Sequence, residues 1–261
     1  MGSPWLIRYK PNPAASIRLF CFHCVGGSAS EFRRWPAHLP DKIELTAVQL
    51  PGREARVNEP FIVTVDDLTR GVVEAIAPLL DKPYVVFGHS FGAIAGFEAI
   101  REFRRRGLKQ PFLFVPAGRR GAHVKETRPA IGALPQDEFA EEIKKRYGDH
   151  LGAIWENPEL RELMIPQIHA DFALSEAYRF REELPLDCPI VAFAGVDEKN
   201  LKAEALNAWS AHTSRTFQSR RFPGGHFFIR ESQVLTIEAI KQAIAVARRE
   251  QTVGLPLACR S

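Results

Sequence analysis

The chain has few cysteines, and this shortage argues against two kinds of site. Its 261 residues include only Cys21, Cys24, Cys188 and Cys259, which are too few and too scattered for a disulfide framework. Cys21 and Cys24 form a C-x-x-C pair, but Cys21 falls inside a strand-like run and not at a helix N-terminus, where a redox thiol would be activated. No second pair completes a zinc site. We therefore expect no metal and no cofactor.

Long apolar runs and concentrated charge are also missing. No apolar stretch approaches the roughly 20 residues that a membrane span requires, and the first residues lack the charged-then-apolar pattern of a signal peptide. The net charge is only +4, and the arginine clusters are not interleaved with aromatic residues in a nucleic-acid-binding stripe. We expect a cytoplasmic protein that binds neither nucleic acid nor a membrane.

Short strand-like runs alternate with helical patterns along most of the chain. The runs are rich in Val, Ile and Phe and are bounded by Gly or Pro; they are residues 5–9, 17–23, 43–50, 84–88, 111–116, 189–195 and 216–222. Helical patterns cover residues 66–80 (with Asp66 as N-cap), 91–106, 203–212 and 231–248. This alternation predicts the α/β class, with a mostly parallel central sheet flanked by helices. We expect a single domain over residues 1–249 and a flexible tail over residues 250–261.

The alternation is interrupted from about residue 123 to residue 183, where no strand pattern occurs. Helical patterns cover residues 139–147 and 159–180, and Pro166 is expected to interrupt the second. A helical insertion between two strands predicts a lid over the active-site edge of the sheet. Its apolar side chains, among them Met164 and Phe172, either line an acyl pocket or pack the lid onto the sheet, and we expect that both occur.

Residues 88–92 read Gly-His-Ser-Phe-Gly, the G-x-S-x-G pattern of a nucleophile elbow. A strand-like run precedes this segment and a helical pattern of small residues follows it, as the motif requires. Gly88 and Gly92 are needed because a Cβ at either position would meet the neighbouring strand or helix. Ser90 is therefore the candidate nucleophile.

A histidine follows the last strand-like run on a Gly-Gly loop, at His226. Serine first, an acid in the middle and histidine last is the order of the triad in the α/β-hydrolase fold. We expect His226 to act as the general base. We expect Asp197 to orient it, because Asp197 follows the run 189–195 at the end where catalytic groups collect in parallel sheets. The adjacent Glu198 is the second choice.

The oxyanion that forms during acyl transfer needs hydrogen-bond donors. One is the backbone N–H of Phe91, the residue after the nucleophile. The loop after the second strand-like run supplies the other, and we assign it to Val25. Gly26 and Gly27 follow directly and let the backbone approach the substrate closely, so we expect both to contact it.

Several segments together resemble the type II thioesterases of nonribosomal peptide and polyketide biosynthesis, over about residues 5–246. The matching segments are residues 22–30, 48–54, 88–92 and 223–228 and the lid pairs Asp171-Phe172 and Tyr178-Arg179. The chain departs from the family pattern at His23, Cys24 and Val25, where proline, histidine and alanine are usual, and at Val196. The bulkier Val25 would narrow the acyl entrance.

The resemblance implies an α/β-hydrolase fold and a serine thioesterase that edits biosynthetic intermediates. Such an enzyme removes stalled or wrongly primed small acyl groups from the phosphopantetheine arm of acyl or peptidyl carrier proteins, through an ester on Ser90. No carrier-protein segment precedes Trp5 and no Asp-Ser-Leu attachment motif occurs. We therefore expect the enzyme to act in trans.

Two other functions stay open at this point. A chain-releasing fatty acyl thioesterase or a general carboxylester hydrolase can use the same fold and triad, because a fold does not fix the substrate. A non-catalytic binding protein of this fold would usually have a damaged triad, whereas all three residue types are present here.

Overall fold

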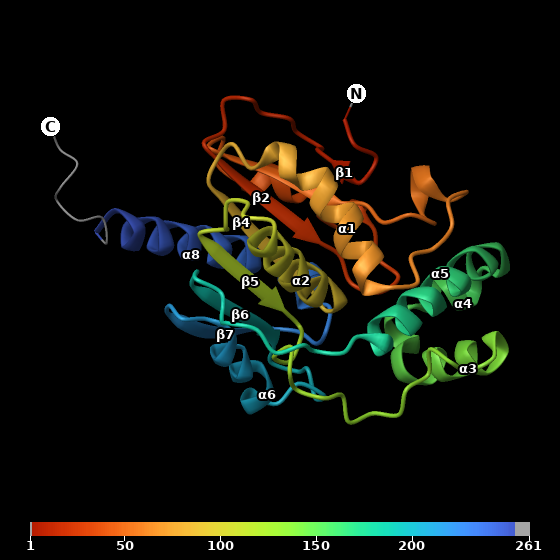
Figure 1. Ribbon diagram of the computed structural model, residues 1–261. Helices are drawn as coiled ribbons and strands as arrows, with labels where there is room; N and C mark the ends of the chain where they lie inside the picture. The colour runs from red at the N-terminus through yellow and green to blue at the C-terminus, as the bar shows by residue number, and fades with distance from the viewer. Residues whose placement is uncertain (1, 254–261) are drawn as a thin grey trace, which may run out of the picture.

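A seven-stranded sheet forms the centre of the computed structural model, which describes residues 2–253 (Figure 1). The strands are Leu6–Ile7 (β1), Ile17–Phe22 (β2), Ile43–Val48 (β3), Tyr84–His89 (β4), Leu113–Ala117 (β5), Ile190–Gly195 (β6) and Phe217–Phe222 (β7). Their order across the sheet is β1-β3-β2-β4-β5-β6-β7. Only β1 runs antiparallel to its neighbour among these strands. The predicted mostly parallel sheet is confirmed.

Helices cover both faces of the sheet, because strand side chains alternate between two apolar clusters. In β4, Tyr84 and Val86 pack with the helices Val65–Ile76 (α1), Phe91–Arg105 (α2) and Ala203–Asn207 (α6). Val85 and Phe87 point to the opposite face, which the helix Gln233–Val253 (α8) covers. A short helix, Phe228–Glu231 (α7), precedes α8. Both faces of β4 are therefore buried, which explains its continuous apolar sequence.

Two predicted helix boundaries need correction. Thr64, not Asp66, caps α1: the Thr64 hydroxyl accepts a hydrogen bond from the Asp67 N–H at 3.0 Å, while its backbone is still extended. The second correction concerns the last helix. α8 runs through residues 250–253, for which the sequence predicts a loose tail. The rest of that predicted tail, residues 254–261, lies outside the described residues.

The predicted helical insertion is present and consists of Gln136–Tyr147 (α3), Gly152–Glu156 (α4) and Pro158–Ala177 (α5), which we call the lid helices. They lie beyond the ends of the parallel strands toward which the arrows of β2 and β5 point in Figure 1. They have an apolar cluster of their own, formed by Phe139, Ile143, Ile165 and neighbouring side chains. The expected interruption at Pro166 is wrong, because α5 continues through it; the lost backbone hydrogen bond is offset by burial of Ile165 and Ile168 beside it.

No helix within residues 2–253 is both long enough and apolar enough to cross a membrane.

Candidate active site

Ser90 occupies a strained backbone position between β4 and α2. Its φ of 56° and ψ of −117° lie in a region that non-glycine residues rarely adopt. A Cβ on Gly88 would lie 2.2 Å from the carbonyl oxygen of Gly92, and one on Gly92 would lie 2.4 Å from that of Phe22. The turn is further fixed by the Ser90 N–H, which donates to Ala117 O at 2.7 Å. The predicted elbow is therefore present, and it presents Ser90 at the C-terminal edge of the sheet.

His226 lies on the loop between β7 and α7, and two neighbouring loops fix its position. Gly195, at the end of β6, packs so closely on this loop that a Cβ there would lie 2.2 Å from Gly225 O. His89 Nε2 donates to the backbone carbonyl of His226 at 2.8 Å. Burial, and then the nearby charge of His226, lower the pKa of His89 to about 3. His89 is therefore neutral at physiological pH and holds the loop in place by hydrogen bonding alone.

The carboxylate that contacts His226 belongs to Glu198, not to Asp197. Glu198 Oε1 accepts a hydrogen bond from His226 Nδ1 at 2.6 Å, and the Glu198 side chain is only 8% exposed. Asp197 is exposed. Its backbone N–H donates to Gly224 O at 3.0 Å, which fixes the turn after β6 so that the next residue carries its side chain toward His226. The prediction of Asp197 is corrected to Glu198, the second choice from the sequence.

The environment of Glu198 favours its ionised form. Burial alone would raise its pKa, but the hydrogen bond and charge of His226 act in the opposite direction and hold the pKa below its ordinary value. An ionised carboxylate on Nδ1 leaves Nε2 of His226 as the proton acceptor, which is the tautomer that a general base requires.

The loop of residues 23–28, which the sequence predicts to form part of the oxyanion hole and which we call the glycine loop, is held by α5. Asp171 on α5 accepts a hydrogen bond from the Gly26 N–H at 2.8 Å, and Gln167 Nε2 donates to Gly26 O at 2.9 Å. Arg53 makes a bidentate ion pair with Asp171, with both N···O distances 2.8 Å, and also donates to Gly27 O at 2.9 Å. We refer to Arg53, Gln167 and Asp171 as the loop clamp.

None of the three members of the loop clamp was assigned a role from the sequence. Arg53 and Asp171 both fall in segments that carry the family resemblance, and that resemblance was the feature of the sequence that could have identified them as site residues. Their contact joins positions 118 residues apart in the chain, which no local pattern reveals. Gln167 gave no signal.

A cavity of about 310 Å³ opens beside Ser90, between the sheet edge and the lid helices. Glu198 and His226 also line it. Val25 and the four residues predicted to bind the substrate lie on its wall, namely Gly26, Gly27, Met164 and Phe172. Phe91, the other predicted oxyanion donor, is buried and is not among the described residues that line the cavity. Met164 and Phe172 also pack against the apolar cluster of the lid helices, so both expected roles apply to them.

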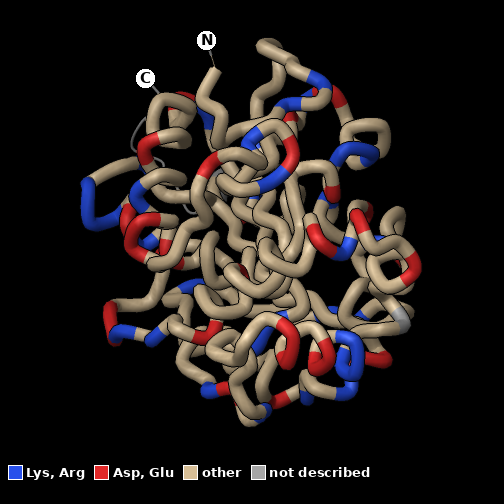
Figure 2. Tube along the Cα trace, turned by 90° about the vertical axis from the view of Figure 1, so that its right-hand side faces the viewer, with Lys and Arg blue, Asp and Glu red and all other residues tan. Residues whose placement is uncertain are grey.

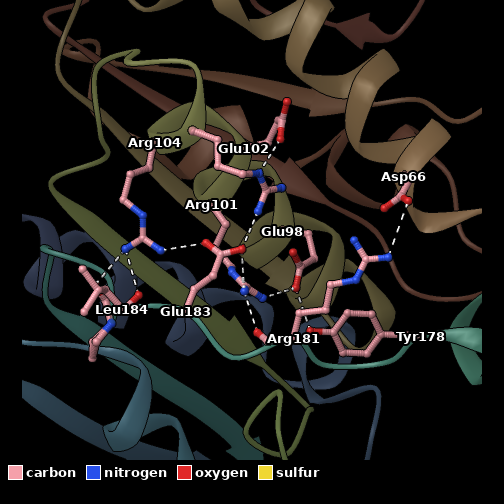
Figure 3. A network of polar contacts seen from close by, with 11 residues as sticks. Asp66, Glu98, Arg101, Glu102, Arg104, Tyr178, Arg181, Glu183 and Leu184 are labelled. Carbon is pink, nitrogen blue, oxygen red and sulfur yellow. Dashed lines mark hydrogen bonds and ion pairs between the residues drawn. The ribbon is translucent and has the colours of Figure 1, made fainter.

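The segment that leaves the lid is anchored to the helix that follows Ser90 (Figure 3). Tyr178, just after α5, donates its hydroxyl to Glu98 Oε1 on α2 at 2.7 Å. Arg101, one turn further along α2, pairs with the same carboxylate at 2.8 Å and with Glu183 at 2.7 Å. Arg101 is buried, so these partners satisfy a charge that water cannot reach. The position of α5 is thus tied to α2 as well as to the glycine loop.

One group of potential metal ligands lies behind the elbow. Donor atoms of Cys24, Glu31 and His89 all fall within 4.8 Å of one another, and these residue types can bind zinc. The Glu31 carboxylate is already paired with Arg230 at 2.8 Å. Burial raises the pKa of the Cys24 thiol well above its usual value, so a cation would have to displace a proton there.

The family model for the thioesterase domain matches residues 17–244 of the chain. This protein belongs to the thioesterase family. Linear gramicidin dehydrogenase LgrE of Brevibacillus parabrevis is 35% identical over 253 residues, which cover 95% of this thioesterase and 96% of LgrE.

Solved structures of similar sequence have the same fold. RedJ, a thioesterase from the prodiginine biosynthetic pathway in Streptomyces coelicolor, is 32% identical with a TM-score of 0.80, covering 89% of this thioesterase and 87% of RedJ. BorB, a type II thioesterase from the borrelidin biosynthetic cluster, is 28% identical with a TM-score of 0.81, covering 92% and 95% of the two chains. These likenesses confirm the predicted α/β-hydrolase fold.

Gly92→Ala is expected to destabilise the elbow, because its Cβ would meet backbone atoms that cannot move independently. We expect the free energy of unfolding to fall by about 2 kcal/mol or more, as measured by urea denaturation. Gly152→Ala is the control, because a Cβ on Gly152 meets nothing within 4 Å. Equal stability of the two variants would contradict the steric account of the elbow.

Asp171→Asn is expected to lower the free energy of unfolding by roughly 3–5 kcal/mol, because it leaves the buried Arg53 charge uncompensated. Asp187→Asn is the matched control: its pair with Arg215 is exposed and is worth at most about 1 kcal/mol. Denaturant unfolding of both variants measures the difference. Similar small losses in both would show that the loop clamp contributes little to stability.

Proposed function

We propose that this thioesterase hydrolyses acyl thioesters through an acyl-Ser90 intermediate, with His226 as the general base and Glu198 as the residue that orients it. The observation that carries the proposal is the 2.6 Å contact between Glu198 and His226 on the wall of the cavity that Ser90 also lines. The two residues come from different loops, and the strained elbow brings the serine to the same edge of the sheet.

The first half of the reaction forms the acyl ester. His226 takes the hydroxyl proton of Ser90 as Ser90 Oγ attacks the thioester carbonyl. The tetrahedral intermediate collapses and the C–S bond breaks, which releases the thiol with the proton that His226 held. Hydrolysis follows when His226 removes a proton from water, the resulting oxygen attacks the ester carbonyl, and the proton returns to Ser90 as the acid leaves.

The backbone N–H groups of Val25 and Phe91 are proposed to bind the oxyanion. In the glycine loop, the N–H of Gly26 is taken by Asp171 and that of Gly27 by Cys24 O, so Val25 is the residue whose N–H is left for a ligand. Phe91 is the first residue of α2, and the first N–H groups of a helix have no partner within it. The loop clamp holds Gly26, and therefore positions Val25.

The proposed substrate is an acyl group on the phosphopantetheine arm of an acyl or peptidyl carrier protein, and the proposed role is removal of stalled or wrong groups. RedJ is named as a thioesterase of the prodiginine biosynthetic pathway and BorB as a type II thioesterase of the borrelidin biosynthetic cluster, which supports a role of this thioesterase in a biosynthetic pathway. The name of LgrE mentions a dehydrogenase, whereas the Glu198–His226 pair beside Ser90 supports acyl transfer. A general carboxylester hydrolase or a fatty acyl thioesterase is the alternative.

Ser90→Ala is expected to abolish hydrolysis of acyl thioesters, and Glu198→Gln to lower kcat by roughly 10²–10⁴-fold, because the amide cannot stabilise the imidazolium. Asp197→Asn is the matched control and is expected to retain activity within about threefold, since Asp197 is exposed. The thiol released from N-acetylcysteamine thioesters measures all three. An inactive Asp197→Asn variant beside an active Glu198→Gln variant would restore the assignment made from the sequence.

Carrier-bound thioesters are expected to be better substrates than the same acyl groups on N-acetylcysteamine. The chain is mildly basic, and carrier proteins, by the family resemblance, are acidic. Figure 2 shows Lys and Arg interspersed with Asp and Glu on the side that carries the lid helices, so the attraction rests on the net positive charge of the chain and not on a basic patch on this side.

The test compares kcat/KM for both substrate forms as salt is raised, since the Debye length falls from about 30 Å at 0.01 M to about 3 Å at 1 M. We expect the advantage of the carrier-bound form to shrink with salt. Equal values for both forms at every salt concentration would favour the general carboxylester hydrolase.

A further inference from the structure

The cavity beside Ser90 has an arginine on its wall that the hydrolytic mechanism does not use. Four arginines line this cavity: Arg119, Arg120, Arg128 and Arg230. Arg120 and Arg128 share the carboxylate of Glu126, at 3.0 and 3.2 Å, and Arg230 pairs with Glu31 at 2.8 Å. Within residues 2–253, the Arg119 side chain has neither an ion pair nor a hydrogen bond.

The Arg119 side chain is half-buried on the cavity wall. Its Nε is buried and has no hydrogen-bond partner among the described residues. Burial, and then the adjacent charge of Arg120, lower the pKa of Arg119 to about 10, so it remains charged at neutral pH. Glu126 acts on this charge only from a distance, since its carboxylate is paired with Arg120 and Arg128. A partly desolvated cation with no ion pair of its own is costly, and part of that cost is recovered when an anion binds. Guanidinium groups favour carboxylates, which they bind through two parallel hydrogen bonds.

The backbone around Arg119 places it close to the reacting atoms. Arg119 comes two residues after the end of β5, and its carbonyl accepts a hydrogen bond from Trp209 Nε1 at 2.8 Å. The preceding Gly118 lies against the catalytic histidine: a Cβ there would be 3.4 Å from Cε1 of His226. Arg119 and Ser90 line the same cavity, so an anion bound by Arg119 can belong to the acyl group whose carbonyl Ser90 attacks. The phosphate of a phosphopantetheine arm lies much further from the thioester sulfur.

We propose that Arg119 forms a carboxylate-binding subsite, so that this thioesterase accepts acyl groups that carry a second, free carboxylate, as in the half-thioesters of dicarboxylic acids. The inference rests on the proposed thioester hydrolysis and adds a substrate class to it. Glu126 holds Arg120 and Arg128 beside the subsite, which keeps the surrounding field positive. The apolar wall formed by Met164 and Phe172 would hold the methylene groups of the chain.

The test uses charged and neutral acyl groups of matched size on N-acetylcysteamine, which carries no phosphate. The pairs are malonyl with butyryl and adipyl with heptanoyl, and kcat/KM is measured for each. We expect wild type to favour the charged member of at least one pair. Arg119→Gln should lower that charged-to-neutral ratio by roughly 10–100-fold, the range for loss of a charge-assisted hydrogen-bonded pair. Arg119→Lys should keep part of the preference.

The controls separate this proposal from other roles of Arg119. Arg34→Gln, at an exposed arginine outside the cavity, should leave the ratio unchanged. Should Arg119→Gln fail to fold, glutaramate, which has a free carboxylate, and pentanamide, which has none, are compared as inhibitors of wild type, and we expect glutaramate to inhibit at the lower concentration.

Three results would overturn the subsite. The first is an unchanged ratio in a folded Arg119→Gln variant. The second is a loss confined to phosphopantetheine thioesters, whatever their acyl charge, which would assign Arg119 to the phosphate of the arm. The third is equal inhibition by glutaramate and pentanamide. In each of these cases, hydrolysis of the neutral thioesters by wild type would leave the proposed function intact, whereas no hydrolysis of any thioester would contradict the proposed function itself.

Discussion

The close approach of the nucleophile elbow to its neighbours is the constraint on which the rest of the site depends. Gly88 contacts the start of α2, and Gly92 contacts the end of β2, so the chain must reverse within a few residues. Ser90 absorbs this reversal with a positive φ. As a consequence, the serine stands at the edge of the sheet, and α2 begins immediately after it at Phe91, whose N–H has no partner within the helix. A looser turn would lose the nucleophile and one oxyanion donor together.

A second constraint joins the lid helices to this edge. The Arg53–Asp171 pair is buried, and it reaches the glycine loop through Gly26 N–H and Gly27 O. Tyr178, at the end of the same helical segment, is fixed to α2 through Glu98. The helix that forms one wall of the acyl cavity is therefore held in its C-terminal half by the glycine loop, and just beyond its C-terminus by the helix of the nucleophile. Movement of α5 would disturb substrate contacts and oxyanion binding at the same time.

Local sequence patterns predicted most of the fold because its elements are buried on regular periods. The strands β1 to β6 and the elbow follow from short apolar runs bounded by glycine or proline, whereas β7 has apolar residues only at its two ends. Ser90 and His226 follow from their motifs. The choice between Asp197 and Glu198 could not be made in this way. Both residues follow β6, and the turn set by Asp197 N–H and Gly224 O decides which side chain reaches His226.

Contacts between distant segments were the other part that sequence could not supply. Pro166 looked like a helix break, but tertiary packing of its neighbours carries α5 through it. The loop clamp joins a residue after β3 to one on α5. The isolation of Arg119 is visible only once the partners of the other three cavity arginines are known. In each case the deciding interaction is between residues far apart in the chain.

The most direct test of the central claim is mass spectrometry of the enzyme quenched during turnover of an acyl thioester. The account predicts that a fraction of the protein gains the mass of the acyl group and that, after proteolysis, the gain falls on the peptide containing Ser90. Because Glu198 orients the base needed for deacylation, the acylated fraction is measured in the Glu198→Gln enzyme as well. Turnover with an acyl adduct confined to another residue, such as Cys24 on the same cavity wall, would contradict the account.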